Sequence, residues 1–228
     1  MKKRASSQGP ARGKSNAPSR ADKQHGKQSG KRGQAAAGPG RLRIIGGRFK
    51  RRLLNVIDAP GLRPTPDRVR ETLYNWLGFH VGGARVLDLY AGSGALGLEA
   101  LSREAAHVTF VERDSRVARA LEANLATLAN GDSLPTQVVT GDVLHWLETA
   151  TPAAGGMDLV LLDPPFRLEL AAASCALLEA HGWLSDDAMI YLEVESGLDP
   201  VVPANWQLHR ESRAGDSHGR LYRRHPPA

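Results

Sequence analysis

Cysteine and long hydrophobic runs are scarce in this sequence. Its 228 residues contain one cysteine, Cys175, so no internal disulfide can form, and this usage is typical of a reducing cytoplasm. No apolar run approaches the ~18 residues that a membrane-spanning helix needs. No apolar segment follows the basic N-terminus, as it would in a secretory signal. The eight histidines lack metal-ligand spacing. We therefore expect a cytoplasmic protein with no membrane span and no metal.

Acidic residues are nearly missing from the first forty positions. Residues 1–40 hold ten Lys or Arg and a single acid, a net charge of +9. Residues 41–70 add +7, whereas residues 71–228 carry −10. The first segment also has almost no large apolar side chain to bury, so we predict that 1–40 is a disordered basic arm. Its charge fits a contact with phosphate, although a solvated tail that only aids solubility fits equally well.

Residues 81–228 predict one domain in which apolar strands alternate with helices. Strands are expected at 85–90, 108–112, 137–140, 157–163, 189–195, 206–211 and 220–224. Helices are expected at 95–103, 115–128, 144–149 and 168–181. This alternation is typical of an α/β fold with a doubly wound, mostly parallel, Rossmann-like sheet. The last two strands would give that sheet an antiparallel edge.

Residues 41–80 predict a small extension made of a β-hairpin and a helix. The hairpin turns at Gly46-Gly47, and a helix follows with Val69, Leu73, Trp76 and Leu77 at core spacing. Several basic residues crowd onto this extension, and their charge suits a ligand that carries phosphate. They are Arg43, Arg48, Lys50, Arg51, Arg52, Arg63, Arg68 and Arg70.

Four successive strands of the domain end in an acid. These acids are Asp88, Glu112, Asp142 and Asp163. The first precedes a glycine-rich turn with Gly92 and Gly94, which also fits a dinucleotide-binding loop. A carboxylate there would repel a pyrophosphate, but it suits S-adenosylmethionine, which carries a sulfonium and an ammonium. We expect Glu112 to accept from the ribose hydroxyls and Asp142 to reach the adenine.

The segment Asp163-Pro164-Pro165-Phe166 is the candidate catalytic motif. It places a carboxylate, a backbone carbonyl and an aromatic ring at one edge of the sheet. Two acceptors on an exocyclic amino group keep the nitrogen lone pair available and stabilise the charge that develops as a methyl group arrives. This chemistry serves an amino group of guanine or of adenine, and the residues alone do not choose between them.

Four segments together resemble the RsmD family, the bacterial 16S ribosomal RNA guanine-N2 methyltransferases. They are Arg43-Ile-Ile-Gly-Gly, Asp67-Arg-Val-Arg-Glu-Thr-Leu-Tyr-Asn-Trp, Asp88-Leu-Tyr-Ala-Gly-Ser-Gly and Asp163-Pro-Pro-Phe. The resemblance implies a class I methyltransferase fold with a seven-stranded sheet, S-adenosylmethionine as donor, and 16S rRNA in a 30S particle as substrate. It also implies that Asp163 and the Pro164 carbonyl orient the guanine and that Phe166 stacks on it. The basic residues of the extension would then hold RNA backbone. We expect a monomer.

Three other functions remain open at this point. The first is N6 methylation of adenine in DNA or RNA, which the same motif would serve. The second is a NAD-dependent oxidoreductase that uses the glycine turn, against which Asp88 and the Asp163 motif argue. The third is an RNA-binding or assembly protein that keeps the fold without catalysis.

Overall fold

The computed structural model describes residues 40–60, 62, 65–166 and 170–226. The predicted arm at 1–40 therefore lies almost wholly outside the described residues, and so does Arg63. Residues 37–228 form one compact unit. None of the helices in the described part is long and apolar enough to cross a membrane.

The expected alternation of strands and helices is present. The strands are Gly40–Arg43 (β1), Leu53–Val56 (β2), Arg85–Leu89 (β3), His107–Glu112 (β4), Thr136–Thr140 (β5), Met157–Leu162 (β6), Leu184–Glu195 (β7), Trp206–Ala214 (β8) and Ser217–Arg224 (β9). The helices are Asp67–Leu77 (α1), Ala95–Ser102 (α2), Ser115–Ala129 (α3), Val143–Thr149 (α4) and Leu170–Ala180 (α5), with a 3-10 turn at Gly78–His80.

The main sheet has seven strands in the order β5-β4-β3-β6-β7-β9-β8. The strands from β5 to β7 pair in parallel, and β9 and β8 pair antiparallel at the end of the sheet. After β3 the chain runs outward through β4 and β5, then returns to place β6 on the other side of β3. The β3–β6 boundary is therefore the topological switch point, beyond whose carboxyl end ligands bind in such sheets.

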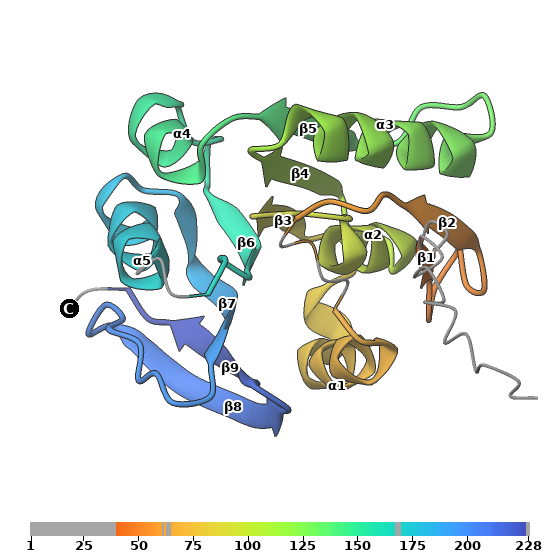
Figure 1. Ribbon diagram of the computed structural model, residues 1–228. Helices are drawn as coiled ribbons and strands as arrows, with labels where there is room; N and C mark the ends of the chain where they lie inside the picture. The colour runs from red at the N-terminus through yellow and green to blue at the C-terminus, as the bar shows by residue number, and fades with distance from the viewer. Residues whose placement is uncertain (1–39, 61, 63–64, 167–169, 227–228) are drawn as a thin grey trace, which may run out of the picture. The chain divides into compact units, whose positions relative to one another are not determined.

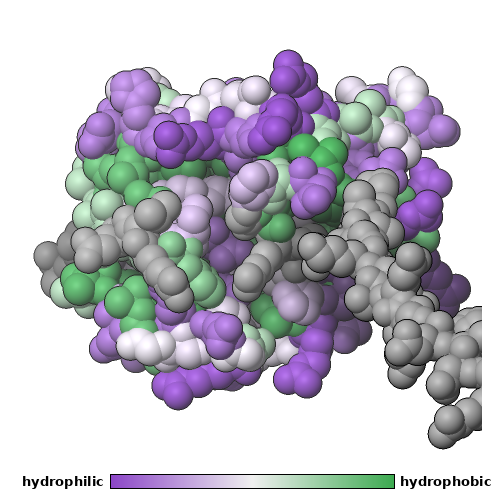
Figure 2. Space-filling view, viewed as in Figure 1, coloured by the Kyte–Doolittle hydropathy of each residue, from purple (hydrophilic) through white to green (hydrophobic). Residues whose placement is uncertain are grey.

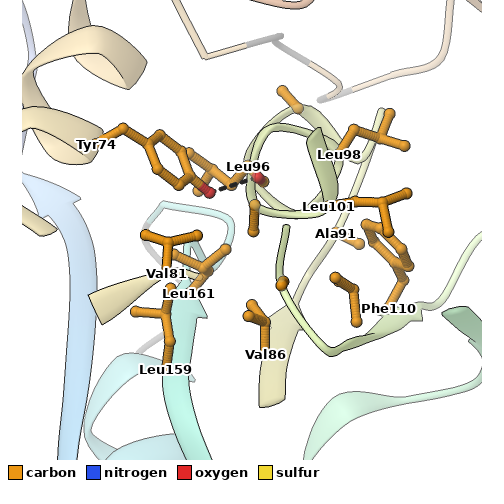
Figure 3. Packing of buried hydrophobic residues seen from close by; sticks show 14 of the residues in the cluster. Tyr74, Val81, Val86, Ala91, Leu96, Leu98, Leu101, Phe110, Leu159 and Leu161 are labelled. Atoms are coloured by element: carbon orange, nitrogen blue, oxygen red, sulfur yellow. Dashed lines mark hydrogen bonds between the residues drawn. The ribbon is translucent and has the colours of Figure 1, made fainter. Parts of the chain in front are cut away.

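Helices cover both faces of this sheet (Figure 1). The β1–β2 hairpin and α1 to α3 share one core with the first face, in which Phe110, Val86 and Leu161 pack against α2 (Figure 3). On that side the Tyr74 hydroxyl donates to the Leu96 carbonyl at 2.6 Å. Helices α4 and α5 cover the opposite face, where Cys175 is buried and burial raises the pKa of its thiol to about 12. The extension is thus part of the domain's core.

Two segments differ from the sequence expectation. Strand β7 begins at Leu184 rather than Met189, because its first residues pair beside Met157 although their side chains are polar. Trp76 packs against the core as expected but is only partly buried, while its neighbours Tyr74 and Leu77 are fully buried. The buried face of α1 is therefore shifted slightly from the one that its apolar spacing predicts.

Candidate active site at the carboxyl edge of the sheet

The strand register places several acids on one face of the sheet. Asp88 on β3 is in register with Leu161 on β6, and Leu161 is in register with Tyr191 on β7. Side chains in register project to the same side, and so do those two residues further along each strand. Asp163 and Glu193 therefore follow Leu161 and Tyr191 on the face that α1 and α2 cover. They stand next to the switch point.

The glycine turn between β3 and α2 is tightly wound. Tyr90, Gly92 and Gly94 have φ angles of +60°, +55° and +74°. Residues other than glycine rarely adopt this left-handed backbone conformation. The Tyr90 hydroxyl lies 2.9 Å from the Ser174 hydroxyl on α5, which holds the one non-glycine residue of the three. A Cβ on Gly94 would lie 2.5 Å from Leu121, so glycine is required there for space as well.

Asp88, at the end of β3, binds the backbone just after this turn. It is 2% exposed, and its carboxylate accepts from the Gly97 amide at 2.9 Å in the first turn of α2. Burial, with a smaller contribution from the Glu112 charge, raises the pKa of Asp88 to about 8, against the effect of the Gly97 hydrogen bond. The acid that the sequence places at a strand end thus connects β3 to the first turn of α2, directly after the glycine turn.

Glu112 and Asp142 take defined positions at the neighbouring strand ends. Glu112 accepts from the Gly92 amide at 2.8 Å and from the Asp114 amide at 2.7 Å, which ties the end of β4 to the glycine turn. An ionised carboxylate has about four lone-pair sites, so acceptor capacity remains. Asp142 is exposed and caps α4 by accepting from the His145 amide at 3.1 Å.

The candidate catalytic motif follows β6 directly. Asp163 is half buried, and its carboxylate accepts no hydrogen bond from any residue that the structure describes. Burial raises its pKa well above the ordinary value, and the charges of Glu193 and Asp88 add to this. Pro164 is buried, Pro165 is exposed, and Phe166 is 37% exposed despite its apolar ring. The Asp163 carboxylate, which has no donor among the described residues, and the exposed Phe166 ring thus lie three residues apart in sequence.

Sequence reasoning missed Glu193 and Tyr191. Glu193 is 6% exposed near the end of β7, and the Tyr191 hydroxyl donates to its Oε2 at 2.8 Å. The available signal was an acid inside the apolar run of β7, the same signal that identified Asp88. Burying such a carboxylate is costly without a partner. Its position beside Asp163 makes it part of the same site.

Most of the candidate RNA-binding residues are exposed, and one of them is buried. Arg48, Lys50, Arg51 and Arg52 are exposed on the connection between β1 and β2, as expected. Arg43 is also exposed, but its guanidinium is bound to the Asp67 carboxylate at 2.6 Å. Arg68 is exposed on α1.

The assignment of Arg70 to RNA binding is wrong. Its side chain is 1% exposed, so a phosphate cannot reach it. Nη2 donates to Asp67 at 2.6 Å and to the Arg43 carbonyl at 2.8 Å, and Nη1 lies 3.5 Å from Glu99. Arg70 instead fastens α1 to the hairpin and to α2. Arg70 lies three residues before Leu73 and seven before Leu77, so helical spacing places it on the buried face of α1.

Comparison with known proteins identifies the family. Residues 42–223 match the model of the family described as Conserved hypothetical protein 95. Over 191 residues the chain is 52% identical to the ribosomal RNA small subunit methyltransferase D of Escherichia coli K12, a match that covers 82% of this chain and 92% of that protein. This chain belongs to the RsmD family.

Other members of the RsmD family support the same fold. The chain is 43% identical over 183 residues to the ribosomal RNA small subunit methyltransferase D of Haemophilus influenzae, covering 80% of this chain and 94% of that protein. The solved structure of the Escherichia coli protein yhhF matches with a TM-score of 0.74 at 47% identity, over 82% of this chain and 100% of that one. The Haemophilus influenzae protein HI0767 matches with a TM-score of 0.70 at 40% identity, over 82% and 99%. The expected class I methyltransferase fold is confirmed.

Proposed function

We propose that this RsmD-family protein transfers a methyl group from S-adenosylmethionine to the exocyclic N2 of a guanine in 16S rRNA, in the 30S subunit or an assembly intermediate. The observation that carries the reaction type is the Asp163 carboxylate, an acceptor without a donor in the described residues at the switch point of the sheet. The substrate is supported by the names of the relatives from Escherichia coli and Haemophilus influenzae.

The electrostatics of the site fit a cationic cofactor. Burial and the charge of Glu112 raise the pKa of Asp88, and no described basic side chain opposes this. A positive ligand would relieve the crowding of negative charge, whereas a pyrophosphate would add to it. S-adenosylmethionine supplies a methyl group on a positively charged sulfur. We infer that the glycine turn admits its methionine portion and that the remaining lone pairs of Glu112 accept from its ribose.

Asp163 and the Pro164 carbonyl would act on the amino group of the acceptor base. By accepting its two hydrogens they keep the nitrogen lone pair available, and they stabilise the positive charge that develops on nitrogen. The methylated nitrogen then loses a proton to solvent, so no strong base is needed. The exposed ring of Phe166 offers a face on which the base can stack.

Glu193 favours guanine over adenine as the base. Guanine presents an N1–H donor beside its amino group, whereas the N1 of adenine is an acceptor. Two neighbouring carboxylates, Asp163 and Glu193, suit two neighbouring donors. A protonated N1 next to Glu193 gains a hydrogen bond, and an adenine N1 would face a buried anion. N6-methyladenine is therefore the second candidate product.

The proposal is tested by labelling with tritiated S-adenosylmethionine. Thirty-S particles and naked 16S RNA, both from a strain that lacks the matching methyltransferase, are incubated with the protein and digested to nucleosides. We expect label in N2-methylguanosine, more strongly on particles. Label in N6-methyladenosine would overturn the choice of base.

The role of Asp163 is tested by Asp163→Asn. We expect kcat to fall by at least ~100-fold, which is the cost of losing one preorganised electrostatic partner, while calorimetry shows S-adenosylmethionine binding as in the wild type. Asp132→Asn, at an exposed position between α3 and β5, is the matched control and should keep full activity. Full activity in Asp163→Asn would refute the assignment.

A further inference from the structure

The described arginines differ in whether an acid already neutralises them. Arg85, Arg116, Arg223 and Arg224 each lie within 3.1 Å of a carboxylate oxygen. Arg68 on α1 and Arg213 on β8 are exposed, and neither has a carboxylate partner in the part of the chain that the structure describes. An arginine without such a partner is free to bind an external anion. Arg68 and Arg213 share this property with other exposed arginines, such as Arg48 and Arg210, and differ from them because both line one hollow.

Arg68 and Arg213 lie on opposite sides of one hollow. It is lined by Arg68, Thr72 and Trp76 from α1 and by Tyr191, Arg213 and Gly219 from the sheet. Figure 1 shows the end of β8 close to α1, and in Figure 2 hydrophilic and hydrophobic residues are mixed along this side of the molecule. The enclosed space is about 20 Å³, room for about one water molecule. A ligand must therefore lie across the rim.

The hollow adjoins the acceptor site through Tyr191. This side chain lines the hollow, and its hydroxyl donates to Glu193, whose charge raises the pKa of Asp163. Neighbouring strands lie about 4.8 Å apart, so β9 stands about 10 Å from β6. An RNA strand that presents a base at Asp163 passes over the hollow with its next nucleotides.

We propose that this hollow, which we call the Arg68–Arg213 groove, binds the single-stranded RNA that flanks the target base. The inference rests on the proposed function. Trp76 packs against the core but is partly exposed where it lines the hollow, and it offers a ring edge or face for a flanking base, as in single-stranded RNA recognition. The two guanidinium groups pair with the phosphates on either side of it. The groove therefore adds a second RNA contact to the basic connection between β1 and β2.

The groove is tested with Arg213→Gln and with the matched control Arg223→Gln. Both residues lie on the β8–β9 hairpin, but Arg223 is paired with Asp187 at 2.7 Å. We expect Arg213→Gln to raise the KM for the RNA substrate about tenfold with kcat retained, and to reduce the salt slope of binding by about 0.7, as for one lost phosphate contact on a single strand. Arg223→Gln should change neither quantity.

Trp76→Phe and Trp76→Leu separate stacking from folding. Phe keeps a ring face and should retain most RNA affinity, whereas Leu should weaken it by about tenfold, within the range for loss of one stacked base. Binding of S-adenosylmethionine should stay unchanged in all variants. If the wild type methylates guanine but Arg213→Gln behaves like Arg223→Gln, the groove is refuted. If the wild type methylates no guanine but Arg213→Gln still weakens rRNA binding, the groove stands and the proposed function fails.

Discussion

Glu99→Gln should loosen the attachment of the β1–β2 hairpin to helix α2. Glu99 on α2 is 0% exposed. Its carboxylate accepts from the Ile45 amide at 2.9 Å, from the Gly46 amide at 2.8 Å and from Arg103 Nε at 3.0 Å. The Arg70 guanidinium lies 3.5 Å away. The Glu99 side chain thus joins α2 to two other segments. These are the connection between β1 and β2, and helix α1.

The expected cost follows from what glutamine keeps and loses. The shape is preserved, but the charge disappears, and the new NH2 group must face a donor. Breaking a buried ion pair costs about 3–5 kcal/mol, and each hydrogen bond to a charged group contributes about 1.5–3 kcal/mol. Arg70 retains Asp67 at 2.6 Å, which limits the loss. We therefore expect a decrease in the free energy of unfolding of about 3–4 kcal/mol, or a Tm lower by about 6–16 °C for a chain of this size.

Urea unfolding followed by circular dichroism measures this difference. Glu122→Gln on α3 is the control, because its side chain is exposed and removes no described ion pair. It should change stability by less than about 0.5 kcal/mol. A loss below about 1 kcal/mol in Glu99→Gln would refute the inference that this carboxylate holds the hairpin in place.

Two further predictions follow from the same structure. Gly47→Ala should destabilise the fold by more than about 2 kcal/mol, because φ is +71° and a Cβ would overlap the Ser102 carbonyl oxygen; Gly215→Ala, with φ +58° and open space, should cost only about 1 kcal/mol in denaturant unfolding. Methylation needs the Asp163 carboxylate ionised, and its raised pKa means that kcat/KM falls as the pH drops towards that pKa, above the ordinary range of an aspartate. Glu193→Gln removes a like charge, so a pH–rate profile should show this acid limb displaced to lower pH. An unmoved limb would refute the inference that the Glu193 charge raises the pKa of Asp163.

Features of the chain that repeat along it were predictable from the sequence. Apolar runs gave the strands, and acids at their ends gave the carboxyl edge of the sheet, because a parallel sheet collects its strand ends on one side. Asp88 and Asp163 were found in this way. The family resemblance added the substrate, which the residues alone left between two bases.

Features that depend on tertiary partners were not predictable. Arg70 was predicted to contact RNA, whereas the folded chain buries it 3.5 Å from the buried Glu99. Trp76 read as core because its spacing matched a buried stripe, yet the space beside the β8–β9 hairpin leaves it partly exposed. Arg213 carried no local signal at all. Its role depends on a helix more than a hundred residues earlier in the chain.

The burial of Cys175 has a practical consequence for labelling. This thiol is the single cysteine of the chain, and its pKa of about 12 leaves almost no thiolate at neutral pH. The folded protein should therefore be inert to maleimide without any cysteine being removed. A cysteine introduced at an exposed position would carry one fluorophore at one known place, ready for distance measurements against labelled ribosomal RNA. Reaction of Cys175 itself would then report molecules that have opened.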